Sequence, residues 1–442
     1  MKKLLSIVMC SSLVVLLSNN ANAAGFALLE QSGKGVGDAF SGAVVGYGDG
    51  SEAFFNPAAQ TQLNGTTFAW QVSLIDLKID FKNMGSTDSS GQPLLGHSSD
   101  GGGVKPMPSV YLSHKLTDDL AVGFSFNVPY GFDIKYSKDW IGRYKAVESA
   151  IKYYSFTPSI AYEVLPHLSI GGGFGFSYVD AKISNAIDFG SLGQKFLGPD
   201  RAALMGLYPQ SSDGFVTLSG DDWTTQFNIG ALYTFGPNDR NKIGIDWRSR
   251  IRSDIGAHAY FDVPENAKFI QANDMFVNTS AGAHLTMPEV VTFGSQYWIT
   301  DRWAIQEEIA WTRWSRFKEL RIRYGSSQPD SVENENWTNS WRYSVGTQYK
   351  LTDNLTVRGG WTHDQGTIYD PYRSPRVPDQ TRNWMAYGLD YQLTDNIDLY
   401  VSYAYLFVHG AASDIADSFG NRLIGRYNLG IQTVAFGMTA SF

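Results

Sequence analysis

One stretch of this chain reads LTDDLAVGFSFNV, from Leu116 to Val128. Its first part has the composition of a tight turn, because Asp side chains hydrogen-bond their own backbone and tolerate left-handed conformations. From Leu120 onward, bulky apolar residues occupy every second position, and small or polar residues stand between them. Successive side chains of a strand point to opposite faces, so the stretch predicts a hairpin leading into a strand with one apolar face.

The same kind of turn recurs along the chain. Residues 299–303, 351–355 and 393–397 repeat the pattern of an apolar residue, Thr, Asp, a polar residue and an apolar residue. Two further short connections lie at 165–167 and 236–240. The flanking segments alternate as the first one does, which indicates a protein built from antiparallel hairpins.

Fourteen strands are predicted, an even number, as bacterial membrane barrels of one chain require. Their approximate ranges are 66–81, 106–115, 120–128, 153–164, 168–182, 223–235, 242–251, 288–299, 303–314, 339–350, 355–364, 383–392, 397–407 and 432–442. Short and long connections alternate between them. Such barrels have short turns on the periplasmic side and long loops outside, so we expect the loops at 183–222 and 252–287 to be extracellular.

The amino terminus has the pattern of a secretory signal peptide over residues 1–23. Lys2 and Lys3 precede an apolar run and an Ala-Asn-Ala site. The remaining chain carries 33 basic and 43 acidic residues, a balance that disfavours a nucleic-acid partner. Its only cysteine, Cys10, lies within the predicted signal, so disulfides are not expected in the mature chain.

The mature chain contains no run of about 18 apolar residues that a membrane helix needs. Helices and closed barrels alone satisfy every backbone hydrogen bond in hydrocarbon. The sequence therefore favours an all-β fold, an antiparallel transmembrane β-barrel in the outer membrane, over a large secreted all-β protein. The last strand ends on Phe442, which resembles the signal read by the barrel-assembly machinery.

Three features depart from the regular pattern. In the first strand the apolar positions change phase after Leu74, which predicts a β-bulge there. Glu307 shares the parity of the face assigned to lipid, which indicates either a slip in register or a polar contact at a defect in the wall or at another protomer. Residues 24–63 precede the first strand and form either a mobile leader or a plug in the lumen.

The two longest loops carry apolar clusters. A loop in water gains nothing from such clusters unless they pack together or bind an apolar ligand. Their members are Phe196, Leu197, Leu204 and Met205 in the first loop, and Phe269, Ile270, Met275 and Phe276 in the second.

Several segments resemble the long-chain fatty acid transporter family, FadL, with its aromatic-hydrocarbon relatives of the TodX type. Residues 24–28 and 37–42, with Asn56-Pro57-Ala58, are similar to that family's amino-terminal hatch. The resemblance implies a hatch over residues 24–63 inside a fourteen-stranded barrel over 64–442. Asn127-Val128-Pro129-Tyr130-Gly131 resembles the family's inward kink, through which a ligand leaves sideways into the bilayer. From the residues alone, Pro129 and Gly131 are equally consistent with a plain strand end.

The resemblance also implies a pocket for a ligand headgroup. Arg321 stands where the family has a cation, and Asp379 lies near an acid of the same region. A guanidinium can hold a carboxylate through two hydrogen bonds, although a solvated loop arginine is the alternative. The sequence departs from the family at Asn185, where the archetype has a second arginine. That departure weakens the case for a fatty acid carboxylate and strengthens the case for a less charged hydrocarbon.

We therefore expect a passive transporter that takes up hydrophobic small molecules, most of all long-chain fatty acids. The alternatives are transport of neutral or aromatic hydrocarbons by the same route, an outer-membrane hydrolase, and a general porin. The seven histidines are scattered, so neither a metal nor a cofactor is expected. The expected partners are the ligand, membrane lipid, lipopolysaccharide and the barrel-assembly machinery, with the protein acting as a monomer.

Overall fold

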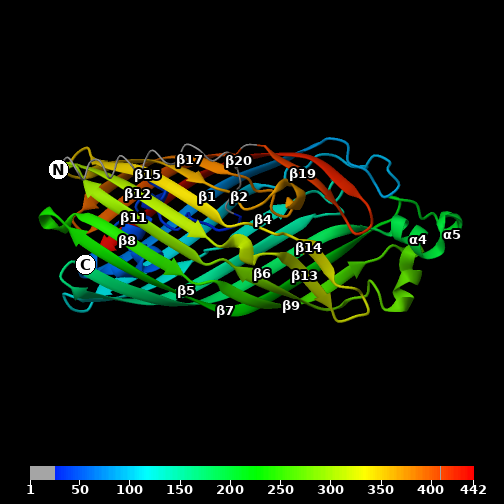
Figure 1. Ribbon diagram of the computed structural model, residues 1–442, viewed down its shortest axis with the longest axis horizontal. Helices are drawn as coiled ribbons and strands as arrows, with labels where there is room; N and C mark the ends of the chain where they lie inside the picture. The colour runs from blue at the N-terminus through cyan, green and yellow to red at the C-terminus, as the bar shows by residue number, and fades with distance from the viewer. Residues whose placement is uncertain (1–24, 409) are drawn as a thin grey trace.

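The computed structural model describes residues 25–408 and 410–442, so the predicted signal peptide lies outside the described residues. The chain forms a closed antiparallel barrel of fourteen strands, which confirms the expected fold (Figure 1). The barrel closes where β1 (Thr66–Asn83) pairs with β20 (Arg422–Ser441). Among the described residues, no helix has both the length and the apolar character needed to cross a bilayer.

Six of the fourteen strands are broken into two segments. Between β1 and β20, the wall consists of β2 (Gly103–Lys115), β3 (Leu120–Asn127) with β4 (Gly131–Lys135), β5 (Glu148–Leu165), β6 (Leu168–Asp188), β7 (Asp213–Phe235), β8 (Asn241–Arg248) with β9 (Ile251–Asp262), β11 (Val290–Trp298) with β10 (Thr279–Met287), β12 (Trp303–Thr312) with β13 (Glu319–Tyr324), β15 (Ser340–Lys350) with β14 (Ser331–Asn334), β16 (Leu355–Asp364), β17 (Arg382–Thr394), and β18 (Ile397–Val408) with β19 (Ala411–Ala416).

The strands extend farther on the long-loop side than the sequence predicted. β6 continues to Asp188, β7 begins at Asp213 and β9 runs to Asp262. The loops predicted at 183–222 and 252–287 therefore shrink to 189–212 and 263–278. These loops hold α4 (Phe189–Leu197), α5 (Pro199–Leu204) and η4 (Glu265–Asn273), at the right-hand end of Figure 1.

The phase change in β1 has a different cause from the predicted bulge. β1 pairs without a register shift with both β2 and β20, so the bulge near Leu74 is wrong. Phe68 is exposed on the outer face of the wall, whereas Ile79 and Phe81 are buried inside. Beyond Leu74 the outer face becomes polar and the inner face apolar, as expected for a wall that leaves the hydrocarbon for water.

Glu307 faces outward as its parity indicates. β12 pairs with β11 and β15 in continuous register, which places Glu307 opposite Ser295 and Val345 on the outer surface. A slip in register is therefore not the explanation.

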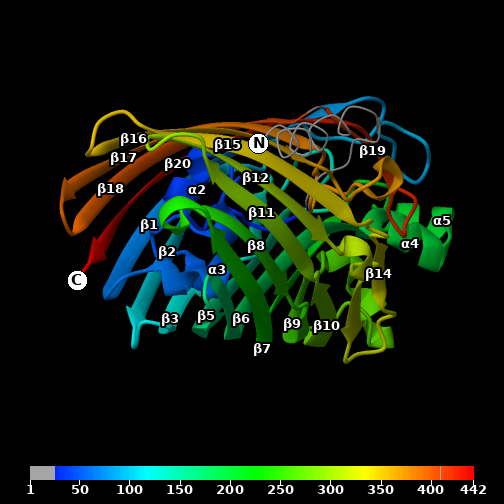
Figure 2. The same ribbon diagram turned by 60° about the vertical axis from the view of Figure 1, so that its left-hand side comes forward.

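Residues 25–63 lie inside the barrel in four short helices (Figure 2). These are α2 (Gly33–Gly37), η1 (Ala43–Val45), α3 (Glu52–Phe55) and η2 (Pro57–Gln62). α2 contacts β16, β17, β18 and β20, whereas η2 contacts β3, β5, β6 and β7. The segment therefore reaches opposite walls, and we call it the hatch.

Buried charges fix the hatch to the wall. The Arg358 guanidinium lies 2.6 Å from the Asp390 carboxylate and 3.5 Å from that of Asp38 in the hatch. On β12, the Glu308 carboxylate accepts a hydrogen bond from the backbone N–H of Val44 in the hatch at 2.8 Å. The same carboxylate pairs with Arg342 of β15 at 2.7 Å. Because these charges are buried, each would be costly to leave without its partner.

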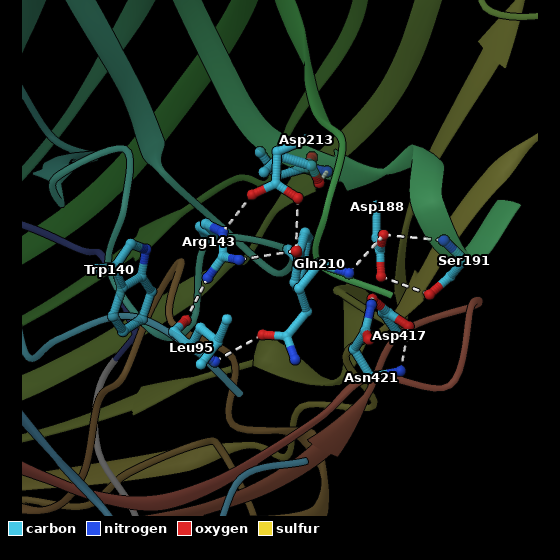
Figure 3. Close-up of polar contacts among 12 residues, drawn as sticks. Leu95, Trp140, Arg143, Asp188, Ser191, Gln210, Asp213, Asp417 and Asn421 are labelled. Carbon is cyan, nitrogen blue, oxygen red and sulfur yellow. Dashed lines mark hydrogen bonds and ion pairs between the residues drawn. The ribbon is translucent and has the colours of Figure 1, made fainter. Parts of the chain in front are cut away.

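Polar contacts join several of the long loops (Figure 3). Arg143 pairs with Asp213 at 2.7 Å and donates to the Leu95 carbonyl at 2.6 Å. The backbone N–H of Leu95 donates to the side-chain oxygen of Gln210, and the backbone N–H of Gln210 donates to the Asp188 carboxylate at 3.1 Å. These bonds join the loops after β1, β4 and β6, and Trp140 is fully buried beneath them. These contacts therefore tie the three outer loops to one another.

A matched pair of glycines tests how the hatch is seated. A Cβ on Gly360 would lie 2.0 Å from the Asp38 carbonyl oxygen, whereas one on its neighbour Gly359 would lie 3.8 Å from the Ala386 carbonyl oxygen. We expect Gly360→Ala to displace the hatch, because overpacking costs about 1–3 kcal/mol. Planar-bilayer recordings should then show higher ion conductance for Gly360→Ala and unchanged conductance for Gly359→Ala. Equal conductance of the two variants would contradict this seating.

Candidate functional site

A cavity of about 520 Å³ lies in the lumen beside the start of the hatch. It is bounded by the hatch, the break between β3 and β4, the inner face of β1 and the loop before β17. Most of its lining is apolar, which suits a hydrocarbon chain. The lining includes Phe26, Leu28, Ile75, Leu77, Met107, Val128, Phe132, Ile134, Trp314, Val377, Pro378, Trp384 and Leu429.

The barrel wall is incomplete next to this cavity. β3 pairs with β2 only as far as Phe126 opposite Val110, and β4 pairs with β5. Within the described residues, no residue of β4 pairs with residues 103–109 of β2 across this gap. At the outer end of the gap, the Lys135 N–H donates to the Gly101 carbonyl. The break falls on Val128, Pro129 and Tyr130, where Pro129 has no N–H to donate.

The hatch supplies the backbone partners that the broken strand lacks. The Leu28 N–H donates to the Pro129 carbonyl, and the Gly131 N–H donates to the Phe26 carbonyl, both at 3.0 Å. Asn127 Nδ2 also donates to the Gln31 side chain of the hatch at 3.1 Å. The residues predicted as the kink are thus joined directly to the first residues of the hatch.

One end of the cavity is acidic. Asp379 accepts a hydrogen bond from the Gly25 N–H at 2.6 Å and lies 3.5 Å from the Arg382 guanidinium. Arg382 also faces Asp364 at 3.7 Å, and Glu30 lines the same end. Burial raises the pKa of Asp379 to about 6, against the lowering effect of Arg382. Three carboxyl groups therefore share the Arg382 guanidinium here, and Arg342, the other arginine of the lining, pairs with Glu308.

The other end, at the gap in the wall, is basic. Lys105 of β2 and Lys152 of β5 both approach the carboxylate of Asp133 in β4, at 3.2 and 3.4 Å. Their side chains are 37% and 39% exposed, which places the two lysines at the mouth of the cavity. Two cations against one carboxylate leave a net positive charge at this mouth.

A second, smaller hollow of about 90 Å³ adjoins the cavity toward the outer loops. Phe26, Phe132 and Val377 line both spaces. Most of the remaining wall of the hollow is apolar and includes Ile151, Leu218, Ile255, Leu285, Phe317, Leu320 and Ile322, and the charged residues Lys182, Glu335 and Arg376 also line it. An apolar path therefore leads from beneath the loops to the hatch.

The apolar loop residues divide into two groups. Ile270 and Phe276 are buried in a cluster with Phe189 and Leu207, and Leu197, Phe269 and Met275 pack against that cluster. Phe196, Met205 and above all Leu204, which is 89% exposed, face outward on α4 and α5. The two loops thus pack together and still present apolar side chains to the outside.

Arg321 does not reach the cavity. It lies on β13 and pairs with Glu319 at 2.7 Å and Asp330 at 3.1 Å, while its neighbours Leu320 and Ile322 line the smaller hollow. The break at 313–318 sets the phase of β13, and this phase points Arg321 away from the lumen. The expectation that Arg321 contributes to the lumenal pocket is therefore not met.

The other predicted residues lie nearer the site. Asp379 lines the cavity. Asn185 accepts a hydrogen bond at 3.3 Å from Arg376, which lines the smaller hollow. Asn56 caps η2 by accepting from the Ala58 N–H at 3.1 Å, and Pro57 occupies the first turn of that helix. The Asn56 amide also donates to Val44 and to Ala231 of the wall, so it joins the hatch to β7.

Sequence reasoning missed Lys105, Lys152 and Arg382. Lys105 belongs to the part of β2 that precedes the predicted strand 106–115, and Lys152 directly precedes the predicted start of β5. The signal that could have found them is the same reversal of the apolar face that is visible in β1. Nothing local distinguished Arg382 from other arginines at strand ends.

Residues 14–442 match the family described as outer membrane protein transport protein (OMPP1/FadL/TodX). The chain belongs to this family. The family consists of outer-membrane transporters, so the chain is an outer-membrane protein and not an enzyme. The hydrolase considered from the sequence is thereby set aside.

Similar proteins share most of the chain's length. The long-chain fatty acid transport protein of Escherichia coli O6:H1 is 27% identical, over 90% of this chain and 89% of that protein. Outer membrane protein P1 of Haemophilus influenzae is 25% identical, over 89% and 88%. The crystal structure of a Pseudomonas aeruginosa FadL homologue has a TM-score of 0.85 at 23% identity, covering 95% of this chain and 100% of that one. The P. putida toluene transporter TodX has a TM-score of 0.65 at 13% identity, covering 90% and 95%.

The raised pKa of Asp379 predicts a pH dependence of the hatch contact. A carboxyl group whose pKa is higher in the seated state stabilises that state below its ordinary pKa, near 3.8. This stabilisation is lost as the pH rises through about 6, by at most about 3 kcal/mol. A spin label at Ala27→Cys should therefore become more mobile between pH 4 and 7, and Asp379→Asn should flatten the profile. An unchanged slope in Asp379→Asn would contradict the assignment to Asp379.

Proposed function

We propose that this protein takes up hydrophobic small molecules passively through the outer membrane, most of all long-chain fatty acids. The observation that carries the proposal is an apolar cavity that adjoins a gap in the barrel wall, with the hatch occupying the lumen beside both. The E. coli relative named as a long-chain fatty acid transport protein supports this class of ligand. A single-chain working unit, and insertion by the barrel-assembly machinery, are proposed with it.

The route we propose has four steps. The exposed side chains of Phe196, Leu204 and Met205 capture the ligand outside. The ligand then passes through the apolar hollow to the cavity. A change in the hatch, in which Asn56-Pro57-Ala58 takes part, frees Phe26 and Leu28 from the broken strand. The ligand finally leaves sideways between β2 and β4.

The physics of transfer favours a sideways exit. Each methylene returned to water costs about 0.8 kcal/mol, or roughly 12 kcal/mol for a chain of about sixteen carbons. A ligand that passes through a gap in the wall enters hydrocarbon and avoids that cost. The polar, charge-paired contacts of the hatch would oppose passage of an apolar chain straight down the lumen.

The charges of the cavity indicate how a fatty acid would lie. Its carboxylate suits the mouth, where Lys105 and Lys152 outnumber Asp133, and not the acidic end near Asp379 and Asp364. We therefore propose Lys105 and Lys152 as the headgroup site, in place of Arg321. Neutral hydrocarbons, as named for the toluene transporter TodX, remain the alternative cargo, because they need no cation.

Replacing both mouth lysines tests the headgroup site. Lys105→Gln with Lys152→Gln should weaken binding of a C16 fatty acid about tenfold, since hydrogen bonds to charged groups contribute about 1.5–3 kcal/mol. Hexadecane binding should not change. Lys135→Gln, on the same wall but outside the cavity lining, is the matched control. Equal losses for acid and alkane would show that the lysines do not hold the headgroup.

A reversible staple tests the lateral exit. Lys105 and Asp133 face each other across the gap at 3.2 Å, and the mature chain is expected to lack cysteine. Lys105→Cys with Asp133→Cys, bridged by a bifunctional methanethiosulfonate reagent that spans the length of the removed lysine side chain, should join β2 to β4 through reducible bonds and reduce ligand uptake at least tenfold. Reduction of the same protein should restore the uptake, which makes the reduced form its own control. Uptake that is equal in both forms would refute the lateral route.

A further inference from the structure

A basic cluster occupies the outer surface of the barrel wall, away from the cavity. It consists of Arg250, Arg252, Arg313, Arg316 and Lys318, which line two adjoining surface hollows. Arg250, Arg252 and Arg316 belong to both hollows. The chain as a whole has a formal charge of −8, so this cluster is a local excess of positive charge.

Breaks in neighbouring strands bring the cluster together. Arg250 lies in the break between β8 and β9, and residues 313–318 form the break between β12 and β13. Between them, Glu289 lies in the break between β10 and β11, and its carbonyl accepts from the Arg313 N–H at 3.0 Å. Three breaks at one level thus direct side chains of several strands to one site.

The acids of the hollows neutralise the cluster only in part. The Glu289 carboxylate pairs with Arg313 at 2.8 Å and with Arg316 at 2.9 Å. Asp254 is the other acid in the lining, and it lies 2.6 Å from His284. Five cations therefore face two carboxylates, and no acid pairs with Arg250, Arg252 or Lys318 among the ion pairs of the described residues.

The cluster lies at the outer edge of the lipid-facing surface. Trp247, Val291, Trp311 and Trp341 stand opposite one another on four neighbouring strands and face outward. Aromatic rows of this kind mark the membrane interfaces of outer-membrane barrels. Arg250 lies three residues beyond Trp247 and Arg313 two residues beyond Trp311, both on the long-loop side, which is the level of the headgroups in the outer leaflet.

One of the hollows combines charge with an apolar floor. Phe227 and Trp247, which are 42% and 37% exposed, line it together with Arg250, Arg252 and Arg316. A ligand that fits must therefore have anionic groups at headgroup level and acyl chains below them. Guanidinium groups bind phosphate through paired hydrogen bonds, and basic clusters at a membrane surface attract anionic lipids.

We infer that this cluster is a binding site for the phosphate groups of the glycolipid in the outer leaflet, the bisphosphorylated lipid A of lipopolysaccharide. The phosphates would contact Arg250, Arg252 and Lys318, and the acyl chains would lie against Phe227 and Trp247. The site is separate from the transport cavity and does not depend on the proposed cargo.

Native mass spectrometry of the mature protein in detergent tests this inference. Bisphosphorylated lipid A should bind at least tenfold more tightly than the same lipid after removal of its phosphates. The triple variant Arg250→Gln, Arg252→Gln, Lys318→Gln should lose that preference. Glu289→Gln, which removes a neutralising carboxylate, should strengthen binding severalfold. Gel mobility with and without heating reports whether each variant is folded.

The controls separate the possible sources of binding. Lys78→Gln with Lys82→Gln removes two cations that alternate with Asp76 and Asp80 on the outer face of β1, and should leave binding unchanged. Inorganic phosphate and phosphatidylglycerol should each bind at least tenfold more weakly than lipid A. Equal binding of phosphatidylglycerol, equal losses in the control variant, or unchanged binding in both the triple variant and Glu289→Gln would each overturn the assignment.

Discussion

The structure depends on one constraint: every backbone N–H and C=O of a barrel wall needs a partner where water is scarce. The wall meets this need by closing β1 onto β20, but the strand that breaks at Val128–Tyr130 cannot meet it alone. Phe26 and Leu28 of the hatch take the places of the missing ladder partners. The hatch is therefore part of the wall as well as an occupant of the lumen. Any movement of its first residues would leave backbone groups of the wall without hydrogen-bond partners. It would also open the cavity behind them.

The wall changes character along its length. In the membrane its outer face is apolar, and its inner face carries the buried Glu308–Arg342 pair and Arg358, which pairs with Asp38 of the hatch. Farther out, the outer face is charged and the inner face encloses apolar clusters around Trp140, Trp314 and Phe189. The cavity lies at the boundary between the membrane part of the wall and the part farther out. An apolar ligand can reach it from the outer clusters, and the polar contacts of the hatch lie below it.

Much of the barrel could be predicted from the sequence, since short-range patterns specify it. The Asp-rich turns fixed one rim, and the alternation from Leu120 to Val128 identified a strand with a lipid-facing side. The same reasoning failed where the apolar face changes sides. The phase change after Leu74 was interpreted as a β-bulge, although β1 pairs in continuous register. The predicted strand at 106–115 also left out Lys105, which belongs to β2. Alternation reveals that two faces differ, but it does not reveal which one meets lipid.

The sequence by itself determined the all-β class, the number of strands and the positions of the short turns, because turn chemistry and two-residue periodicity are local. At Pro129 it left a plain strand end and a kink in the wall open. Only the tertiary structure decided which charges meet. Register across the broken strands turned Arg321 outward to Glu319 and Asp330, and brought Lys105 and Lys152 together on Asp133. The same breaks gathered five cations on the outer wall. These contacts between charged side chains join residues that are far apart in the chain, and no local sequence pattern encodes them.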